Sequence, residues 1–423
     1  MAQGYKAPRG TLDVLPDQQP YWKHVRDTAE RLTALFGYQR IDTPVFEDAA
    51  LFSRTAGEAT DVVQKEMYIL EDRGGQEFAL RPEGTAPICR AYLEHGMHNL
   101  PQPVRLWYWC PIFRYDRPQA GRYRQHTQFG CEAIGEADGA VDAEVIELLW
   151  RLFEELGLES ITMQLNSIGD GRCRPAYVQK LRAYYQDKLS LVCGDCQARY
   201  ELNPLRLLDC KNAPCQPVIL GAPPITEHLC DDCAAHFSSL RSYLDVAGIP
   251  YTLNPRLVRG FDYYTRTVFE MQPPLEGSQS AIGGGGRYDG LIEQLGGPPT
   301  PGVGFGSGIE RMVLNLQHQQ VEVLGAGESQ AVFVAYQVED ARSQAFKLAS
   351  DLRRHGVPAT VAAGGRSLKA QMRQADARGS RYAAIIGQRE LADGAVTLRA
   401  LQDGSQETLP LAEAAARLAS RSS

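Results

Sequence analysis

Apolar residues recur with a helical period near the start of the chain and with a strand period further along. Residues 20–36 predict an amphipathic helix that ends at Gly37. Its apolar face consists of Trp22, Val25, Ala29, Leu32 and Phe36. Residues 37–48 then predict a strand, in which Pro44 marks an edge or a bulge because proline donates no ladder hydrogen bond.

Two longer strands are predicted over residues 106–115 and 125–134, on either side of a polar, arginine-rich loop. Together they predict a long hairpin. A charged hairpin tip of this kind usually contacts a ligand. A helix over 143–156 and a strand over 161–169 follow.

The residue pattern changes between about residues 172 and 246, where prolines, helical fragments and cysteines replace the strand pattern. This stretch reads as a mostly helical inserted module. Strand patterns return over residues 257–271, 281–295 and 302–316. A hinge near residues 321–330 leads to strands that alternate with helices, which is typical of a compact α/β domain. We therefore expect one domain over 1–327, with its insertion at about 172–246, and a second over 328–423.

Length and composition exclude several classes of protein. A chain of 423 residues with 43% apolar and 22% charged residues has the composition of an ordinary globular protein of roughly three domains. No apolar run approaches the roughly 18 residues of a membrane span, and the first 20 residues lack the apolar segment of a secretory signal. A cytoplasmic protein without a membrane partner is expected.

The charge is unevenly distributed. The net charge of −7 argues against a general nucleic-acid coat protein. Residues 366–389 nevertheless carry six basic side chains against Asp376 alone. This basic stretch indicates a phosphate-bearing partner at the C-terminal end, and a solvated helix face is the alternative.

The glycine clusters do not match the common nucleotide motifs. The P-loop pattern is absent, and Ser307 and Ile309 occupy positions where a dinucleotide-binding loop needs glycine. Three arginines, Arg114, Arg259 and Arg311, instead stand beside glycine or aromatic residues at predicted element ends. Guanidinium groups suit bidentate capture of phosphate and carboxylate.

Taken together, these stretches resemble the histidyl-tRNA synthetases of the bacterial class II type, over essentially the full length of the chain. Residues 113–135 are similar to the second class II motif, a strand–loop–strand that holds ATP. Residues 302–314 are similar to the third motif, and residues 20–48 to the dimer-forming first motif. RGFDYYTRTVFE and GGGGRYDG are similar to the two stretches peculiar to the histidine-specific members.

The resemblance implies a fold and an activity. The expected fold is an α+β catalytic domain with an antiparallel sheet flanked by helices, a mostly helical insertion and a C-terminal α/β anticodon-binding domain. The expected enzyme is a histidine–tRNA ligase that activates L-histidine with ATP and Mg²⁺ and transfers it to tRNA(His). A cytoplasmic homodimer is implied. The basic C-terminal stretch would contact tRNA.

The resemblance also assigns the groups that bind ATP. Arg114 matches the arginine that holds the α-phosphate, and Arg311 matches the one on the γ-phosphate side. Arg259 matches the histidine-specific arginine that bridges the substrate carboxylate and the α-phosphate, so Arg114 and Arg259 are the catalytic candidates. Arg122 is a further ATP ligand, and Phe129 is a candidate for stacking on adenine, although an aromatic on a strand is more often core.

Histidine recognition needs both a hydrogen-bond acceptor and a donor, because neutral imidazole carries one N–H and one bare nitrogen. The resemblance places Glu132 and Tyr264 at the imidazole. On a strand, Gln128 and Glu132 share a face. The full set of histidine-binding candidates is Glu83, Thr85, Gln128, Glu132, Arg259, Tyr263, Tyr264 and Tyr288. Arg287 is expected to form part of the pocket wall.

The candidates for tRNA contact lie at the hairpin tip and in the tail: Arg117, Gln119, Arg124, Arg373 and Arg381. Two other functions remain as alternatives. A catalytically inactive, synthetase-like regulatory subunit of histidine biosynthesis would lack the tail and degrade the arginine motifs, both of which are present here. A generic RNA-binding protein would explain the basic tail but not the two histidine-specific stretches.

The cysteines of the inserted module leave two interpretations open. Cys193 and Cys196, with Cys230 and Cys233, form two CxxC pairs that could supply four thiolates to one structural zinc ion. The long separation of the pairs and the zinc-free character of similar proteins count against zinc, and reduced, buried thiols are an equally good interpretation. If zinc is bound, it is expected to affect module stability and acceptor-stem contact but not adenylation.

Overall fold

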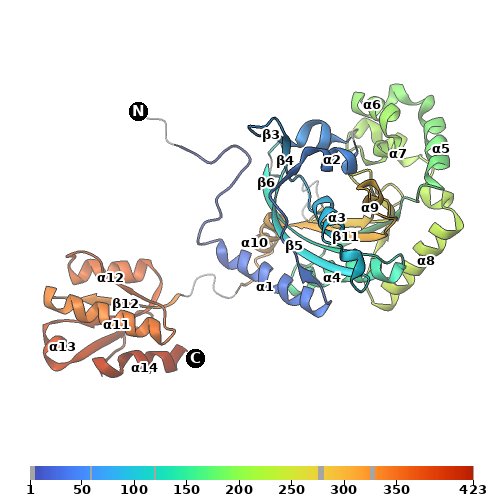
Figure 1. The fold of residues 1–423 in the computed structure, drawn as a ribbon. Coiled ribbons are helices and arrows are strands. Elements are labelled where there is room, and N and C mark those ends of the chain that lie inside the picture. Colours follow the sequence, from blue (N-terminus) through green and yellow to red (C-terminus); the bar gives the residue numbers. More distant parts are fainter. Residues whose placement is uncertain (1–4, 58–59, 119–120, 275–280, 324–328, 423) are drawn as a thin grey trace. The chain divides into compact units, whose positions relative to one another are not determined.

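The computed structural model describes residues 5–57, 60–118, 121–274, 281–323 and 329–422. The chain divides into two compact units, Met1–Glu322 and Val323–Ser423. Both are drawn in Figure 1, coloured along the sequence. The first unit is α+β with a large, mainly antiparallel sheet, and the second has a sheet of its own, as the sequence predicts.

An eight-stranded sheet forms the centre of the first unit, in the order β1-β5-β6-β11-β10-β9-β7-β8. Its strands are β1 (Gln39–Arg40), β5 (Val104–Phe113), β6 (Gln125–Ile134), β7 (Thr162–Ser167), β8 (Thr252–Leu253), β9 (Thr265–Gln272), β10 (Gly283–Arg287) and β11 (Gly302–Gly308). The outermost pairs, β1 with β5 and β7 with β8, are parallel, and the inner pairs are antiparallel. β11, the last of these strands in sequence, lies between β6 and β10 near the middle of the sheet.

The two faces of the sheet have different coverings. One core gathers apolar side chains of α1 (Gln19–Leu35), α4 (Gly139–Glu155) and α10 (Ile309–His318) together with Phe129, Phe269 and Phe305 of the sheet. A second core joins α3 (Thr85–Glu94) and α9 (Leu291–Gln294) to the inserted module. Because side chains alternate along a strand, Gln128 and Glu132 lie on the face opposite to Phe129.

A buried ion pair links the sheet to α4. Arg287 and Asp142 are both wholly buried and their side chains form a short ion pair. Arg287 also donates to the Glu136 carbonyl at 2.9 Å and to Asp289 at 3.0 Å. These contacts use the hydrogen-bond donors of the guanidinium, so Arg287 stabilises the packing of the sheet against α4. It does not form part of the pocket wall, which is where the sequence predicted it.

The stretch after α1 folds as two short strands in two different sheets, where the sequence predicted one. β1 joins the large sheet, whereas β2 (Phe46–Asp48) pairs with β4 (Glu77–Leu80), which also pairs with β3 (Tyr68–Glu71). Between β1 and β2, the Arg81 guanidinium donates to the carbonyls of Thr43 and Pro44 at 2.9 and 3.1 Å. These hydrogen bonds fix the backbone between β1 and β2, where the chain passes from one sheet to the other. α2 (Ala49–Ala56) follows directly.

The inserted module is a helical lobe, drawn from green to yellow in Figure 1. Its helices are α5 (Arg174–Gln186), α6 (Gly194–Leu202), α7 (Gln216–Leu220) and α8 (Asp231–Val246), with short 3-10 turns between them. α8 packs against the main body through Phe237, Leu240 and Leu244. The expected helical character of this region is what the structure has.

The second unit is a five-stranded sheet with helices, in the order β13-β12-β14-β15-β16. Its strands are β12 (Ser329–Tyr336), β13 (Ala359–Val361), β14 (Ser380–Ile386), β15 (Ala395–Ala400) and β16 (Gln406–Pro410). Its helices are α11 (Arg342–Arg354), α12 (Leu368–Ala377), α13 (Gln388–Asp393) and α14 (Leu411–Ser422). The sequence did not predict β16 or α13. β16 is a short edge strand with a single buried leucine, and α13 has only six residues. Within the part of the chain that the structure describes, no helix is both long and apolar enough to cross a membrane.

Candidate active site

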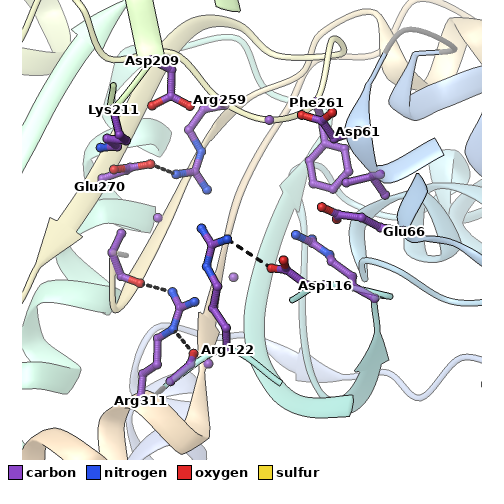
Figure 2. A pocket seen from close by; sticks show the side chains of 18 of the residues that line it. Asp61, Glu66, Asp116, Arg122, Asp209, Lys211, Arg259, Phe261, Glu270 and Arg311 are labelled. Carbon is purple, nitrogen blue, oxygen red and sulfur yellow. Dashed lines mark hydrogen bonds and ion pairs between the residues drawn. The ribbon is translucent and has the colours of Figure 1, made fainter. Parts of the chain in front are cut away.

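A cavity of about 590 Å³ lies in the first unit. β6, β9, β10 and β11, the hairpin after β5, and the segment Asp209–Asn212 of the inserted module all contribute to its lining. Figure 2 shows Arg122, Arg259 and Arg311 turning their guanidinium groups toward the same space. These three cations come from three distant parts of the sequence.

Glycines leave room for the polar side chains of the site. On β11, Gly304 pairs with Glu132 of β6 and Gly308 with Gln128. A Cβ at Gly304 would stand 1.8 Å from Glu132 Oε2, and one at Gly306 would stand 1.6 Å from Gln128 Nε2. Side chains at these two positions are excluded by close contact, which gives the alternating glycines of β11 their physical role.

Two of the arginines are held by backbone carbonyls. Arg114 Nε donates to the Pro82 carbonyl at 2.7 Å, and Arg311 donates to the carbonyls of Gly121 and Ala281 at 2.7 and 2.5 Å. Burial, with the nearby charges of Arg122 and Arg114, lowers the pKa of Arg311 to about 10. Arg114, Arg122 and Arg311 thus place three positive charges near one another, in a fixed geometry that suits a polyanion.

Arg259 approaches the cavity from the side of the inserted module. It forms an ion pair with Glu270 of β9, and its buried Nε has no hydrogen-bond partner among the described residues. Arg206 Nη1 donates to the Arg259 carbonyl at 2.9 Å, so a module side chain fixes the backbone of this arginine. Figure 2 shows Arg259 and Glu270 beside Lys211 of the module.

A buried group of carboxyl and hydroxyl side chains adjoins the cavity. Glu132 accepts hydrogen bonds from Tyr288 Oη at 2.6 Å and from Thr85 Oγ1 at 2.7 Å. Glu83 accepts from the backbone N–H groups of Thr85 and Ala86 at 2.6 and 2.9 Å, at the N-terminus of α3. Burial raises the pKa of the Glu132 carboxyl to about 8, against the opposing effect of the two hydroxyl donors.

Three tyrosines enclose this group. The Tyr263 ring centroid lies 4.7 Å from that of Tyr264 and 6.1 Å from that of Tyr288. Burial raises the pKa of all three phenols, so they stay protonated and able to donate. Gln128, beside them on β6, has a buried Oε1 without a partner in the described chain. An unsatisfied buried acceptor at a cavity wall marks a position for a ligand donor.

The structure thus brings together the predicted histidine-binding residues and three of the four predicted ATP ligands. Phe129 is the exception. Its side chain is wholly buried in the core, with its ring 5.5 Å from that of Phe305 and on the opposite face from Gln128. It is unavailable for stacking on adenine, because the odd positions of β6 face the helices.

Several cavity residues were not found from the sequence. Glu270 and Glu310 supply carboxylates, and Lys211 supplies a further cation. Glu310 Oε1 accepts from the Thr127 amide at 2.8 Å, whereas its buried Oε2 has no partner within the described ranges. Burial raises the pKa of Glu310 to about 7. Glu270 ends the stretch RGFDYYTRTVFE and Glu310 directly precedes Arg311, whereas Lys211 lies in none of the stretches that resemble the family motifs.

The predicted tRNA contacts that the structure describes are not among the residues that line the cavity. Arg117 is exposed, and Arg124 is half-buried with its guanidinium 3.8 Å from the Tyr115 ring centroid. Gln119 lies outside the described residues. In the second unit, Arg373 on α12 and Arg381 on β14 are both exposed.

The prediction of a single zinc site from two CxxC pairs is wrong in its pairing. Cys193 and Cys196 of α6 and its cap converge with Cys210 and Cys215. Cys230 and Cys233, at the start of α8, converge with Asp170 and Cys173. The cysteines between and before the motifs complete each cluster, which spacing within CxxC could not indicate.

Comparisons with known proteins match nearly the whole chain. The family model described as histidyl-tRNA synthetase matches residues 10–169 and 219–312, and the model of an anticodon binding domain matches residues 330–421. The histidine–tRNA ligase of Dehalococcoides mccartyi strain 195 is 56% identical over 407 residues, which cover 96% of this chain and 97% of that protein. The histidine–tRNA ligase of Desulfitobacterium hafniense DCB-2 is 48% identical over 404 residues, covering 96% and 95%.

Solved structures agree. The apo S. aureus histidyl-tRNA synthetase superposes with a TM-score of 0.82 at 36% identity, covering 98% of this chain and 100% of that one. A Bacillus halodurans protein described as an ATP phosphoribosyltransferase regulatory subunit/histidyl-tRNA synthetase has a TM-score of 0.66 at 22% identity, covering 92% and 99%. The latter likeness concerns the fold alone.

Glu132 should make stability depend on pH. In the window from the ordinary carboxyl range up to about pH 8, the folded state holds a proton at Glu132 that the unfolded chain has released. The free energy of unfolding should therefore fall as the pH rises through this window, by about 1.4 kcal/mol per pH unit from this group. Urea unfolding followed by tryptophan fluorescence reports the first unit, which contains all four tryptophans.

Two variants isolate this contribution. Glu132→Gln should remove the component, whereas Tyr288→Phe should extend it to higher pH because the donor that it removes lowers the pKa of Glu132. Equal slopes in the wild type and in Glu132→Gln would show that Glu132 is already ionised in the folded protein.

Proposed function

The chain belongs to the histidyl-tRNA synthetase family and acts as a histidine–tRNA ligase, and we propose that the cavity of the first unit is where it activates histidine. The observation that supports this most strongly is that the arginine-lined cavity adjoins the buried Glu132 group: Gln128 of β6 lines the cavity, and Glu132 lies on the same face of that strand. One part suits the phosphates of ATP, and the other suits the imidazole and ammonium of histidine. Since tRNA charging serves translation, a cytoplasmic location goes with this proposal.

The first chemical step transfers an adenylyl group. A carboxylate oxygen of histidine attacks the α-phosphorus of ATP, the new O–P bond forms, and the bond from the α-phosphorus to the bridging oxygen breaks to release pyrophosphate. The carboxylate is already ionised at neutral pH, so this step needs no general base. A hydroxyl at the 3′ end of tRNA(His) then attacks the histidyl carbonyl and AMP departs. Positioning and charge neutralisation dominate such catalysis.

The arginines supply that neutralisation. Arg114, with its Nε fixed on the Pro82 carbonyl, is suited to the α-phosphate, and Arg311, fixed by two carbonyls, to the outer phosphates. Arg122, ion-paired with Asp116 at 3.2 Å, adds a third cation at the same space. The pKa of Arg311, lowered first by burial and then by the charges of Arg122 and Arg114, supports this assignment, because a bound polyanion would stabilise the charged form of all three.

Arg259 is proposed to bridge the histidine carboxylate and the α-phosphate. Its ion pair with Glu270 and its unpartnered Nε support this role, since bound substrate anions would satisfy the guanidinium more fully. A cation fixed where phosphoryl charge develops stabilises the transition state more than the ground state.

The carboxylates of Glu270 and Glu310 fit a divalent cation beside the phosphates. Carboxylate oxygens are ligands that Mg²⁺ accepts, usually through one or two carboxylates plus phosphate oxygens. Glu310 Oε2, buried and unpartnered within the described residues, is the observation that supports this fit. Bound Mg²⁺ would neutralise phosphate charge, as it does in other phosphoryl-transfer sites.

The imidazole would lie between Glu132 and Tyr264. Glu132 can accept the ring N–H, and the protonated Tyr264 can donate to the bare ring nitrogen. The ammonium group would face Gln128, Glu83 and Thr85. The unpartnered Gln128 Oε1 supports this placement, because an ammonium donor would satisfy it.

The second unit is proposed to bind the anticodon region of tRNA(His). All six basic side chains of residues 366–389 are exposed, and the anticodon-binding model covers the whole stretch. Exposed cations of this density support phosphate contacts. Arg117 and Arg124 at the hairpin are proposed to contact the acceptor end.

A homodimer is proposed through the three-stranded sheet. Val45 and Phe46 at β2, with Ile69 and Leu70 on β3, are 41% to 53% exposed. These exposed apolar side chains lie on both faces of the small sheet, and Val45 and Phe46 belong to the stretch that resembles the dimer-forming first motif, which supports a second copy as their cover.

The regulatory-subunit alternative is less well supported. It predicts degraded arginine motifs and a missing tail, whereas Arg114, Arg259, Arg311 and the second unit are all present. Histidine-dependent exchange of pyrophosphate into ATP tests the proposed function directly. A protein that binds histidine without exchange would support the alternative.

Arg259→Ala should lower kcat of pyrophosphate exchange by about 10²–10³-fold with little change in the KM for histidine or ATP. The reason is that the missing cation acts chiefly on charge that develops in the transition state. Steady-state exchange kinetics measure this, with Arg151→Ala on the exposed surface of α4 as the control. A raised KM with a near-normal kcat would contradict the assigned role.

Arg373→Ala combined with Arg381→Ala should weaken tRNA(His) binding and reduce the salt dependence of log K, by about one unit of slope for each phosphate that is no longer neutralised. Pyrophosphate exchange without tRNA should stay at the wild-type rate. Filter binding across a salt series measures the effect, and Arg417→Ala on α14 is the matched control. Unchanged tRNA binding would remove these two residues from the interface.

The full chain should sediment at twice its mass of 46.7 kDa at micromolar concentration. Ile69→Glu should shift it toward the monomer because a charge would be buried in the apolar contact. Leu253→Glu, at an exposed leucine of β8, should leave the dimer intact. A wild-type monomer, or a dimer unaffected by Ile69→Glu, would argue against this interface.

A further inference from the structure

Four cysteine sulfur atoms of the inserted module point to one another. The Sγ atoms of Cys193, Cys196, Cys210 and Cys215 all lie within 4.8 Å of each other, and Cys193 Sγ stands 3.8 Å from Cys210 Sγ. Four sulfurs around one zinc at Zn–S distances of about 2.3 Å would be roughly 3.8 Å apart. A disulfide would require about 2.05 Å. The spacing therefore matches the edge of a tetrathiolate site.

The backbone around these sulfurs is arranged to hold negative charge. The Cys193 amide donates to Cys215 Sγ at 3.2 Å, and the Asn212 amide points to Cys210 Sγ at 3.5 Å. Cys193 caps α6 and Cys196 lies in its first turn, where the helix end favours thiolates. Cys196, Cys210 and Cys215 are buried. Amide donors to sulfur are what a thiolate ligand set needs from its surroundings.

We propose that Cys193, Cys196, Cys210 and Cys215 bind one Zn²⁺ as a closed, structural tetrathiolate centre. Packing of reduced thiols as small apolar side chains is the competing explanation. It accounts well for Cys89, Cys110 and Cys131, which are buried in the two cores of the first unit. It does not account for four sulfurs that all lie within 4.8 Å of one another in a module of short helices. The family model leaves residues 170–218 unmatched, so the cluster belongs to a part of the chain beyond that likeness.

The centre has a consequence for the active site. Between its two cysteine pairs runs the 3-10 segment Pro204–Asp209, from which Arg206 donates to the Arg259 carbonyl. Cys210, Lys211 and Asn212 themselves line the cavity. A zinc ion bound by the four cysteines would hold this segment of the cavity lining in place. The cysteines are therefore positioning residues. Zinc is therefore expected to affect adenylation, contrary to the expectation from the sequence alone.

A second cluster independently points to a second zinc ion. Cys173 Sγ lies 3.9 Å from Cys233 Sγ, and Asp170 Oδ1 lies 3.6 Å from Cys173 Sγ and 4.0 Å from Cys230 Sγ. The Arg172 amide donates to the same oxygen at 3.0 Å. Three sulfurs and one carboxylate oxygen make a four-ligand set that zinc accepts. We infer that this set, at the junction of the module and the sheet, binds zinc as well.

Metal analysis of the full chain, purified without chelator or added metal, tests both sites. We expect two zinc ions per wild-type chain and one in each of Cys210→Ser and Cys233→Ser, with two retained in Cys110→Ala. One zinc that disappears only in Cys210→Ser would support the first site and overturn the second, and the reverse pattern would do the opposite. Less than about 0.2 zinc per chain, or iron in its place, would overturn both.

Two further measurements keep the test valid if a serine variant fails to fold. Exchange of the wild-type metal for cobalt(II) should give the visible absorption of tetrahedral cobalt thiolate, and its absence would contradict the sites. Cys210→His, which retains a zinc ligand, should keep the metal. Pyrophosphate exchange should fall by about tenfold in Cys210→Ser and recover in Cys210→His. Only Cys210→Ser lacks the fourth zinc ligand, so only in that variant should the segment that carries Arg206 lose its fixed position. Equal loss in both variants would limit the cysteines to a general packing role.

Discussion

Among the glycines that the structure describes, those of β11 that face Gln128 and Glu132 of β6 leave the least room for a side chain. Glu132 and Gln128 occupy the volume that side chains at Gly304 and Gly306 would fill. A strand with so many glycines is intrinsically weak, since glycine loses more backbone entropy on folding than other residues. Its pairing on both edges, with β6 and β10, offsets that weakness. The cavity thus depends on a strand that could not persist at a sheet edge.

In both parts of the site, around Arg311 and around Glu132, burial makes the charged form of a side chain less stable. Around Arg311, burial and neighbouring arginines disfavour positive charge, and around Glu132, burial disfavours negative charge. The pKa of Arg311 is therefore lowered and that of Glu132 is raised, and the charged form of each becomes more stable when a ligand of opposite charge arrives. Stability given up in this way is recovered on binding, as is common at functional sites.

The sequence predicted most of the fold and the polar members of the site, because period-two alternation on β6 places Gln128 and Glu132 on one face. The same rule, followed strictly, assigns Phe129 to the other face, where the structure has it. Arg287 could not be placed from the sequence, since its partner Asp142 lies on a distant helix. The pairing of Cys196 with Cys210, and not with Cys230, depends on how the module folds back between them. Glu270 was missed because a lone carboxylate on a strand carries no periodic signal.

The position of β11 also orders events during synthesis of the chain. β6 is complete at Ile134, but its partner β11 begins only at Gly302, roughly 170 residues later. At ribosomal rates of about 5–20 residues per second, the edge of β6 remains uncovered for about 8 to 34 s. Until then the nascent chain exposes an unpaired strand edge bordered by apolar side chains, a surface on which chaperones act and aggregation begins. β11, the strand that completes the cavity, thus also ends the interval in which the unpaired edge of β6 exposes the new chain to aggregation.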